Sequence, residues 1–348
     1  MDSLTQIVLG AAVAEATLGK KVGNKALLWG GIAGTIPDLD VIYIKLIGGG
    51  AIEEIVLHRG ISHSITFAVL MAPLLGWIVN WLYRKKNEAN FLQWTNLFFW
   101  AIFTHPLLDC LTTYGTQLFL PFSDHRVTIA SVFVVDLFYT VPFLLSVIAV
   151  SFINRTNGWR RKINYLGLGV SSAYLLAGLI NKYVASDVFR KDLATEPEKK
   201  ELVFVGTTPL NIALWYGVAE SDSAFHIGYY SFFDKTEDVS WVSFQKNHHL
   251  IAGIENEYGV ERLRWFGDQL FVLTQPSADT INFYTLKFGR SSFKSTSPDE
   301  SFIFYFQIIR KADGTLGYES IRNTKGLNVK KQLGELYDRV MGNVPNFE

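Results

Sequence analysis

The chain has 348 residues, of which 49% are hydrophobic and only 18% charged, and its 32 Lys and Arg balance its 32 Asp and Glu. The charged fraction is below the roughly 25% of soluble proteins, and the absence of a basic stripe argues against a nucleic-acid-binding protein. The single cysteine, Cys110, lies in an apolar run, which excludes a disulfide framework and a thiolate zinc site.

Apolar runs dominate the first half of the chain. They cover residues 4–19, 26–47, 61–83, 94–113, 130–153 and 163–185. Most approach or exceed the roughly 20 residues that a helix needs to cross a bilayer. Runs this long and this poor in charge argue against a soluble all-helical core. We therefore predict an α-helical, multi-pass membrane domain over residues 1–186, with about five to six transmembrane helices.

The loops between these runs alternate in charge. They hold 3, 2, 3, 1 and 4 Lys or Arg residues in chain order. By the positive-inside rule, the first, third and fifth loops are cytoplasmic. This topology places both termini outside the cytoplasm.

The second half of the chain has a different pattern. From residue 187 onward it is more polar, and short alternating stretches such as "AFHIGYYSFF" and "INFYTLKFG" are separated by Gly, Asp, Asn and Pro. This alternation is typical of antiparallel strands. We predict a β-rich extracytoplasmic domain over residues 187–348.

Ionisable residues inside the apolar runs are costly and mark functional sites. Five of them are Asp38, Asp40, His63, His105 and Asp109. We count about 1.5 Å per residue along each helix from its cytoplasmic end. Four of the five residues then lie roughly 16–22 Å from that end, in the outer half of the bilayer, and His63 lies roughly 30 Å from it, at the outer edge. We predict one polar cluster that opens toward the outer surface.

The residue types in this cluster favour a metal ion. His105 and Asp109 are four residues apart and share one helical face. Asp38 and Asp40 are two apart, so both reach one centre only if Pro37 breaks the helix. Imidazole and carboxylate ligands suit zinc, manganese or iron better than calcium. All five residues are predicted metal ligands, and a purely structural role for so much buried charge is disfavoured because the charge needs compensation.

Further polar residues have more than one interpretation. His58 is a sixth ligand, a general acid or a loop histidine without a role. Arg59 and Arg126 either bind a phosphate or carboxylate at the outer rim or anchor lipid headgroups. Glu15, like Asp136, is either a functional carboxylate or a buried helix–helix hydrogen bond.

Four motifs in one order carry a family resemblance. "MDSLTQIVLG", "PDLD", "HRGISHS" and "HPLLDCLTTYGTQLFLPFS" lie within residues 1–190. This arrangement resembles the YdjM/YbcI-type family of membrane-bound metal-dependent hydrolases, also described as LexA-binding inner-membrane-associated hydrolases. Gln6 stands where that family often has a histidine, and an amide oxygen can still act as a weak ligand.

The resemblance implies further residue roles. Asp38 and Asp40 match the P-D-[LI]-D motif of the family. His58, Arg59 and His63 match H-R-G-x-[ST]-H-S, and the residues His105 and Asp109 match H-x-x-x-D. The family is distantly similar to the zinc-dependent phospholipase C and P1 nuclease group, which implies phosphoester hydrolysis.

Together these observations predict a function. The expected protein is a bacterial inner-membrane hydrolase that cleaves a phosphoester of a lipid or lipid-linked substrate with a metal-bound hydroxide at the outer leaflet. His58 and Arg59 are its expected catalytic residues, zinc its expected metal, and nucleic acid is not an expected partner. A metal-ion or proton-coupled transporter and a non-catalytic, metal-stapled scaffold or regulator are the alternatives, and the oligomeric state is left open.

Overall fold

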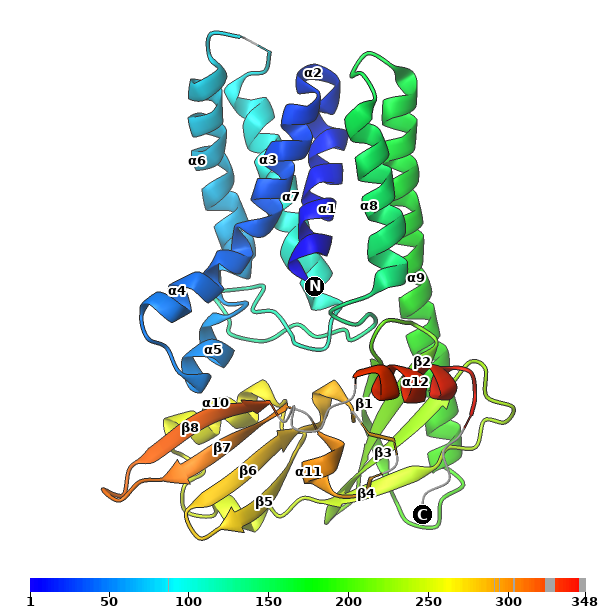
Figure 1. The fold of residues 1–348 in the computed structure, drawn as a ribbon. Coiled ribbons are helices and arrows are strands. Elements are labelled where there is room, and N and C mark those ends of the chain that lie inside the picture. Colours follow the sequence, from blue (N-terminus) through cyan, green and yellow to red (C-terminus); the bar gives the residue numbers. More distant parts are fainter. Residues whose placement is uncertain (87, 291, 294, 303, 323–328, 344–348) are drawn as a thin grey trace. The chain divides into compact units, whose positions relative to one another are not determined.

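A computed structural model describes the chain except for residues 87, 291, 294, 303, 323–328 and 344–348. The chain forms two compact units. The first comprises Met1–Ile47, Leu57–Leu179 and Pro209–Asn211, and the second comprises Gly48–Val56, Ile180–Thr208 and Ile212–Glu348. The first unit is helical and the second carries the strands (Figure 1).

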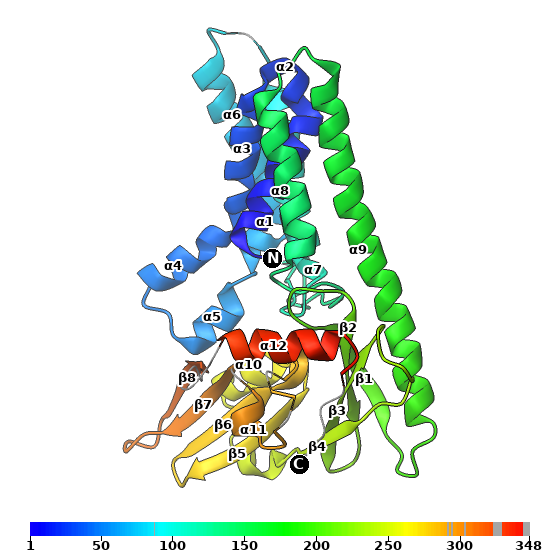
Figure 2. The same ribbon diagram turned by 45° about the vertical axis from the view of Figure 1, so that its right-hand side comes forward.

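Helices occupy the six predicted apolar runs. The elements are α1 (Ser3–Ala14), a π-helical turn (Glu15–Gly19), α2 (Lys20–Val22), α3 (Asn24–Thr35), a 3-10 turn (Pro37–Leu39), α4 (Asp40–Leu46), a 3-10 turn (Ile61–His63), α6 (Ile65–Tyr83), α7 (Phe91–Cys110), α8 (Leu137–Phe152) and α9 (Gly158–Leu193). In both ribbon views, α1, α3 and α7 lie side by side (Figures 1 and 2).

The number of candidate membrane spans is lower than the five to six expected. Within the described residues, α6 and α9 are long and apolar enough to cross a bilayer. A third candidate is α3 together with the segment Pro37–Leu46, which is bent by 43° at the break. The apolar helix α8 has only 16 residues, and α1 has 12 before the π-helical turn. The helical region therefore has two to three candidate spans.

Close backbone contact joins α1 to α3. A Cβ atom added at Gly30 would overlap the carbonyl oxygen of Gly10 and the Cβ of Ala14, and one added at Gly34 would overlap the carbonyl oxygen of Gln6. Small residues of this kind let helices approach closely within membranes. The glycines thereby bring the end of α3 next to the start of α1.

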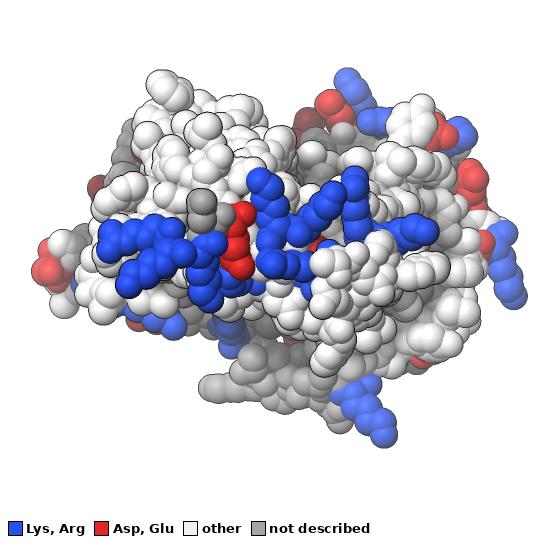
Figure 3. Space-filling model, turned by 90° about the horizontal axis from the view of Figure 1, so that it is seen from above, with Lys and Arg blue, Asp and Glu red and all other residues white. Residues whose placement is uncertain are grey.

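Basic residues gather at one end of the helices. Lys20 and Lys21 are in α2, Arg84–Lys86 follow α6, and Arg155 follows α8. Figure 1 places these segments at the same end, and Figure 3 shows Lys and Arg side chains concentrated over it. The first, third and fifth loops thus share one face of the helical unit, which we call the basic end.

The second unit is β-rich, as predicted. Its described part contains two four-stranded antiparallel sheets, with the strand orders β1-β2-β3-β4 and β5-β6-β7-β8. The strands are β1 (Glu201–Thr207), β2 (Leu214–Glu220), β3 (Ala224–Ser231), β4 (Trp241–Gln245), β5 (Phe271–Ser277), β6 (Thr280–Thr285), β7 (Phe304–Arg310) and β8 (Leu316–Arg322). The helices are α5 (Ala51–Leu57), α10 (Tyr258–Phe266), α11 (Pro298–Ser301) and α12 (Val329–Val340), and 3-10 turns cover His248–Ile251 and Leu286–Phe288.

Both sheets contribute to one hydrophobic core. Tyr216 and Ile227 of the first sheet and Val272 and Tyr284 of the second belong to the same buried cluster. The helix α9 is continuous through residues 186–187, where the sequence pattern changes, and its residue Phe189 packs in the second unit against Trp215.

The close α1–α3 contact makes a testable prediction about stability. Gly30→Ala should destabilise the protein by about 1–3 kcal/mol, because the added methyl group meets backbone atoms that cannot move aside. Gly169→Ala in α9 is the matched control, since a Cβ there has no neighbour within 4 Å and alanine favours a helix. Thermal unfolding of the purified protein measures both. Equal melting temperatures for the two variants would contradict the packing.

Candidate metal centre

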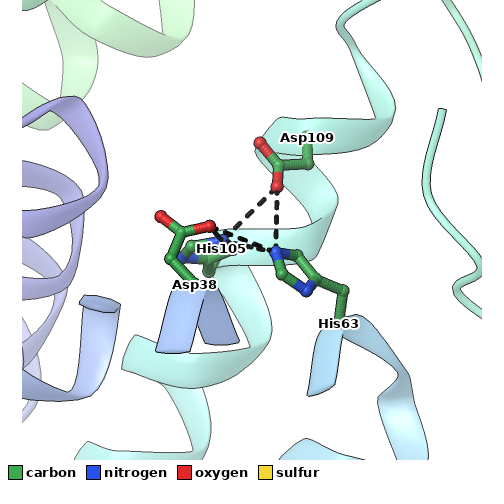
Figure 4. A group of neighbouring side chains, drawn as sticks. All are labelled: Asp38, His63, His105 and Asp109. Atoms are coloured by element: carbon green, nitrogen blue, oxygen red, sulfur yellow. Dashed lines mark hydrogen bonds and ion pairs between the residues drawn. The ribbon is translucent and has the colours of Figure 1, made fainter. Parts of the chain in front are cut away.

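Three segments of the first unit bring four side chains together. Asp38 lies in the 3-10 turn after α3, and His63 ends the 3-10 turn before α6. His105 and Asp109 lie on α7, one turn apart. One ligand atom from each of the four lies within 4.8 Å of the others, and Figure 4 shows the four side chains converging. We call these four residues the Asp/His cluster.

The spacing inside the Asp/His cluster suits a single cation. His63 Nε2 lies 3.1 Å from His105 Nε2. Oδ1 of Asp38 is 3.4 Å from the first of these nitrogens and 3.5 Å from the second. Oδ2 of Asp109 is 3.4 Å from both. Ligands placed tetrahedrally at about 2.0–2.2 Å from zinc are separated by roughly 3.4 Å.

The tautomers of the two imidazoles also fit a metal. His105 Nδ1 lies 2.6 Å from the carbonyl oxygen of Gly34, and a carbonyl only accepts, so Nδ1 carries the proton. His63 Nδ1 lies 3.0 Å from Ser62 Oγ and 3.3 Å from Asp40 Oδ2 and is likewise placed to donate. When both rings are neutral, the two Nε2 atoms present lone pairs to each other. A proton or a metal ion between them removes this repulsion.

The two oxygens of the Asp109 carboxylate have different surroundings. Its Oδ1 accepts from the amino group of Met1 and from Gln6 Nε2 at 3.0 Å, and Arg59 NH2 lies 3.4 Å away. Its Oδ2 is buried and has no hydrogen-bond partner among the residues described. Because an unpaired buried carboxylate oxygen is costly, this atom is ready for a cation. The residues present therefore fit a divalent metal.

Asp40 does not belong to the Asp/His cluster, although the sequence pattern predicts it as a ligand. Its carboxylate accepts from the backbone N–H of Arg59 at 3.0 Å and from Ser62 Oγ at 3.1 Å. Asp38 lies in the 3-10 turn and Asp40 begins α4, so the two side chains leave the chain in different directions. Asp40 holds the "HRGISHS" loop and orients His63.

His58 lies beside the Asp/His cluster. Its Nδ1 lies 3.0 Å from Asp40 Oδ1, and its ring centroid is 5.9 Å from that of His63. Its side chain is 21% exposed, whereas those of His63 and His105 are 0% and 1% exposed. His58 is the accessible imidazole of this region.

The sequence pattern predicts Arg59 and Arg126 at an open outer rim. In the structure both side chains are buried. Arg59 has a φ of 59° and donates to Thr112 Oγ1 at 2.8 Å. Arg126 NH2 donates to the carbonyl oxygen of Tyr114 at 2.6 Å. The guanidinium carbons lie 4.9 and 4.8 Å from the centre of the Tyr114 ring. Both arginines therefore stabilise the α7–α8 loop through hydrogen bonds and cation–π contacts that are shielded from water.

The remaining predicted residues have different positions. Gln6 adjoins the Asp/His cluster through its amide nitrogen, and its Oε1 is buried without a hydrogen-bond partner in the described part of the chain. Glu15 lies at the basic end and not at the centre. Its two oxygens accept from Arg160 Nε and NH2, each at 2.7 Å. Asp136 caps α8 by accepting from the N–H of Phe138 at 3.0 Å.

Several supporting groups escape a sequence-based prediction. The Gly34 carbonyl, the Thr112 hydroxyl and the Tyr114 ring have no distinctive chemistry of their own. The stretch "TTYG", two residues after the H-x-x-x-D motif, is the only signal for the last two.

Metal analysis tests the division between ligands and supporting residues. His105→Ala and Asp38→Ala should lose bound metal, because each removes a ligand atom. Asp40→Asn should retain the site with about 10–100-fold weaker affinity, the usual cost of losing a group that orients a ligand. The measurements are elemental analysis and chelator competition. His125→Ala, which alters an exposed loop histidine, is the control. Equal metal content in all these proteins would contradict the site.

Comparisons with known proteins identify a family for this chain. No solved structure is significantly similar to the chain. The uncharacterized protein YfhP of Bacillus subtilis (strain 168) is 29% identical over 154 residues, which cover 42% of this chain and 45% of YfhP. The chain thus matches less than half the length of that curated relative. The family described as YdjM inner membrane protein matches residues 1–185, which include the whole Asp/His cluster. The chain belongs to the YdjM inner membrane protein family.

Proposed function

We propose that this protein is a membrane-embedded, metal-dependent hydrolase that cleaves a phosphoester of a lipid or lipid-linked substrate. The observation that carries the proposal is the buried set of two imidazole nitrogens and two carboxylate oxygens, with five of its separations between 3.1 and 3.5 Å. Zinc is the metal that this mixed donor set suits best, with manganese and iron as alternatives.

A bound divalent metal supplies Lewis acidity and activates water for attack. The accessible ligand is Asp38, whose side chain is 20% exposed, whereas His63 and Asp109 are at most 1% exposed. A substrate would therefore approach from the side of Asp38. His58, with a similar exposure, is the candidate proton carrier on that side.

Asp40 prepares His58 for proton transfer. Its carboxylate fixes the proton on Nδ1 and leaves Nε2 free to take or give a proton. A carboxylate–imidazole pair of this kind is a common general acid or base. Arg59, expected to bind phosphate, is engaged with Asp109 and Thr112, so we assign it to positioning the Asp109 carboxylate.

Exposed apolar side chains next to Asp38 support an amphiphilic substrate. The exposed apolar residues of this stretch are Leu39, Val41, Ile42, Tyr43, Leu46 and Ile47, and Lys45 is exposed among them. A largely apolar surface with a basic residue is unfavourable in water and fits the boundary between headgroups and acyl chains. A lipid could reach the Asp/His cluster along this surface without leaving the membrane.

The charge distribution supports an outward-facing site. The basic end is cytoplasmic under the positive-inside rule, and Figure 1 places α4 at the opposite end of the helices. We therefore propose that the reaction takes place at the outer leaflet. In this topology the β-rich region is extracytoplasmic, because α9 starts at the basic end and leads away from it.

One observation favours a second candidate function. The Asp/His cluster offers four protein ligands, and closed four-ligand sites are typical of structural zinc, whereas catalytic zinc keeps an open position. A non-catalytic protein whose helices are stapled by metal would use the same residues. The exposed Asp38 favours the hydrolase, because a displaceable ligand opens a position for substrate.

Activity measurements distinguish the two candidates. The metal-loaded, full-length protein should release phosphate from phosphatidic acid or a phosphorylated headgroup from phosphatidylglycerol, and a chelator should abolish this release. His58→Gln should lower turnover by about 10²–10⁴-fold while metal content stays unchanged, because only proton transfer is lost. Mass spectrometry of the products provides the measurement.

His125→Gln is the matched control and should retain full activity. A protein that is stabilised by metal but inert toward every substrate would favour the structural role. Full activity in His58→Gln would remove that residue from the mechanism.

A further inference from the structure

A second site lies at the basic end, at the opposite end of α1 from Gln6. A cavity of about 430 Å³ is formed there by the π-helical turn, the start of α2, the α8–α9 loop and the first turns of α9. We call it the basic cavity. The π-helical turn is itself notable, because such turns frequently occur at functional sites.

The basic cavity is strongly cationic. Lys20, Arg155, Arg160 and Arg161 line it, and Glu15 is its acidic member. Arg160 neutralises Glu15 through two hydrogen bonds of 2.7 Å. Arg155 NH1 is partly engaged by the Lys21 carbonyl oxygen at 2.5 Å and lies 3.6 Å from Glu88 Oε1.

Two of these cations are available to a ligand. Lys20 and Arg161 are exposed and form no ion pair among the residues that the structure describes. The guanidinium carbon of Arg161 lies 5.3 Å from the centre of the Tyr165 ring, which also lines the cavity. The N-terminus of α9 at Gly158 also lines the basic cavity and adds its partial positive charge. This combination is suited to a phosphate group.

A buried hydrogen-bond acceptor in the cavity wall indicates that the ligand also carries a hydrogen-bond donor. Asn164 lines the cavity, is 2% exposed and donates through Nδ2 to the Ala12 carbonyl oxygen at 3.0 Å. Its Oδ1 is buried and has no hydrogen-bond partner in the described residues. This oxygen complements a donor on the ligand. Because the surrounding cations repel an ammonium group, a hydroxyl group is the matching donor.

Aromatic residues place the cavity at headgroup level. Trp159 and Tyr165 line or adjoin it and are 63% and 45% exposed. Exposed Trp and Tyr residues of this kind sit at the membrane–water interface, and basic pockets between membrane helices bind phospholipid headgroups. We propose that the basic cavity binds a glycerophosphate anion, presented by phosphatidylglycerol or as free glycerol 3-phosphate.

Native mass spectrometry of the full-length protein in detergent tests this site, with phosphatidylglycerol in one arm and glycerol 3-phosphate in the other. Lys20→Gln/Arg161→Gln should weaken binding by about fivefold for each charge removed. Lys85→Gln/Lys86→Gln removes the same charge at the same end, outside the cavity, and should leave binding unchanged. The arm that binds with this pattern identifies the source of the anion. Equal effects of the two double variants, or no binding in either arm, would overturn the proposal.

A third lipid tests the hydroxyl group in the wild-type protein. Phosphatidylmethanol has the same charge as phosphatidylglycerol but no headgroup hydroxyl. It should bind about fivefold more weakly, the usual effect of one lost hydrogen bond. Equal affinities for the two lipids would overturn the assignment of the ligand as a glycerophosphate.

Discussion

The helical unit brings the Nε2 atoms of His63 and His105 to within 3.1 Å of each other, and the other features of the site depend on this contact. Backbone and side-chain oxygens hold protons on the opposite ring nitrogens, so that in the neutral rings the facing pair consists of two acceptors. Such a contact inside a buried site is unfavourable without a positive charge between the rings. The oxygen of Asp38 and the oxygen of Asp109 that has no hydrogen-bond partner among the described residues complete a set of four donor atoms that could hold a cation.

The rest of the unit positions these four side chains. Gly30 and Gly34 let α1 and α3 approach closely, which sets the carbonyl group that orients His105. The "HRGISHS" loop is anchored at one end by Asp40 and is joined to the α7–α8 loop by the hydrogen bond from the N–H of Gln117 to the Arg59 carbonyl oxygen, 3.0 Å long. Arg59 and the amino group of Met1 balance part of the buried negative charge next to the site. Local turns and long-range packing therefore serve one arrangement of ligands.

Much of this arrangement was predictable from the sequence. The i,i+4 spacing of His105 and Asp109 places both on one helical face in any helix, and charge inside an apolar run is rare enough to mark a site. Period-two alternation likewise predicted the strands of the C-terminal region. These predictions depend on local geometry, which short stretches of sequence determine.

Other features depend on tertiary contacts and were not predictable. The burial of Arg59 and Arg126 follows from the Tyr114 ring and nearby carbonyl groups, which lie far away in the sequence or carry no distinctive pattern. The role of Asp40 depends on the point at which the chain changes from a 3-10 turn to α4. The described residues contain two to three candidate spans, in part because the apolar runs at α1 and α8 form helices shorter than the runs themselves.

The metal-mediated convergence of the Asp/His cluster is the central claim, and X-ray absorption at the metal edge tests it most directly. Zinc-loaded protein should show two imidazole nitrogens and carboxylate oxygens at about 2.0–2.2 Å, with no sulfur. A spectrum without imidazole scattering, or with the same scattering after His63 and His105 are both replaced, would contradict the account.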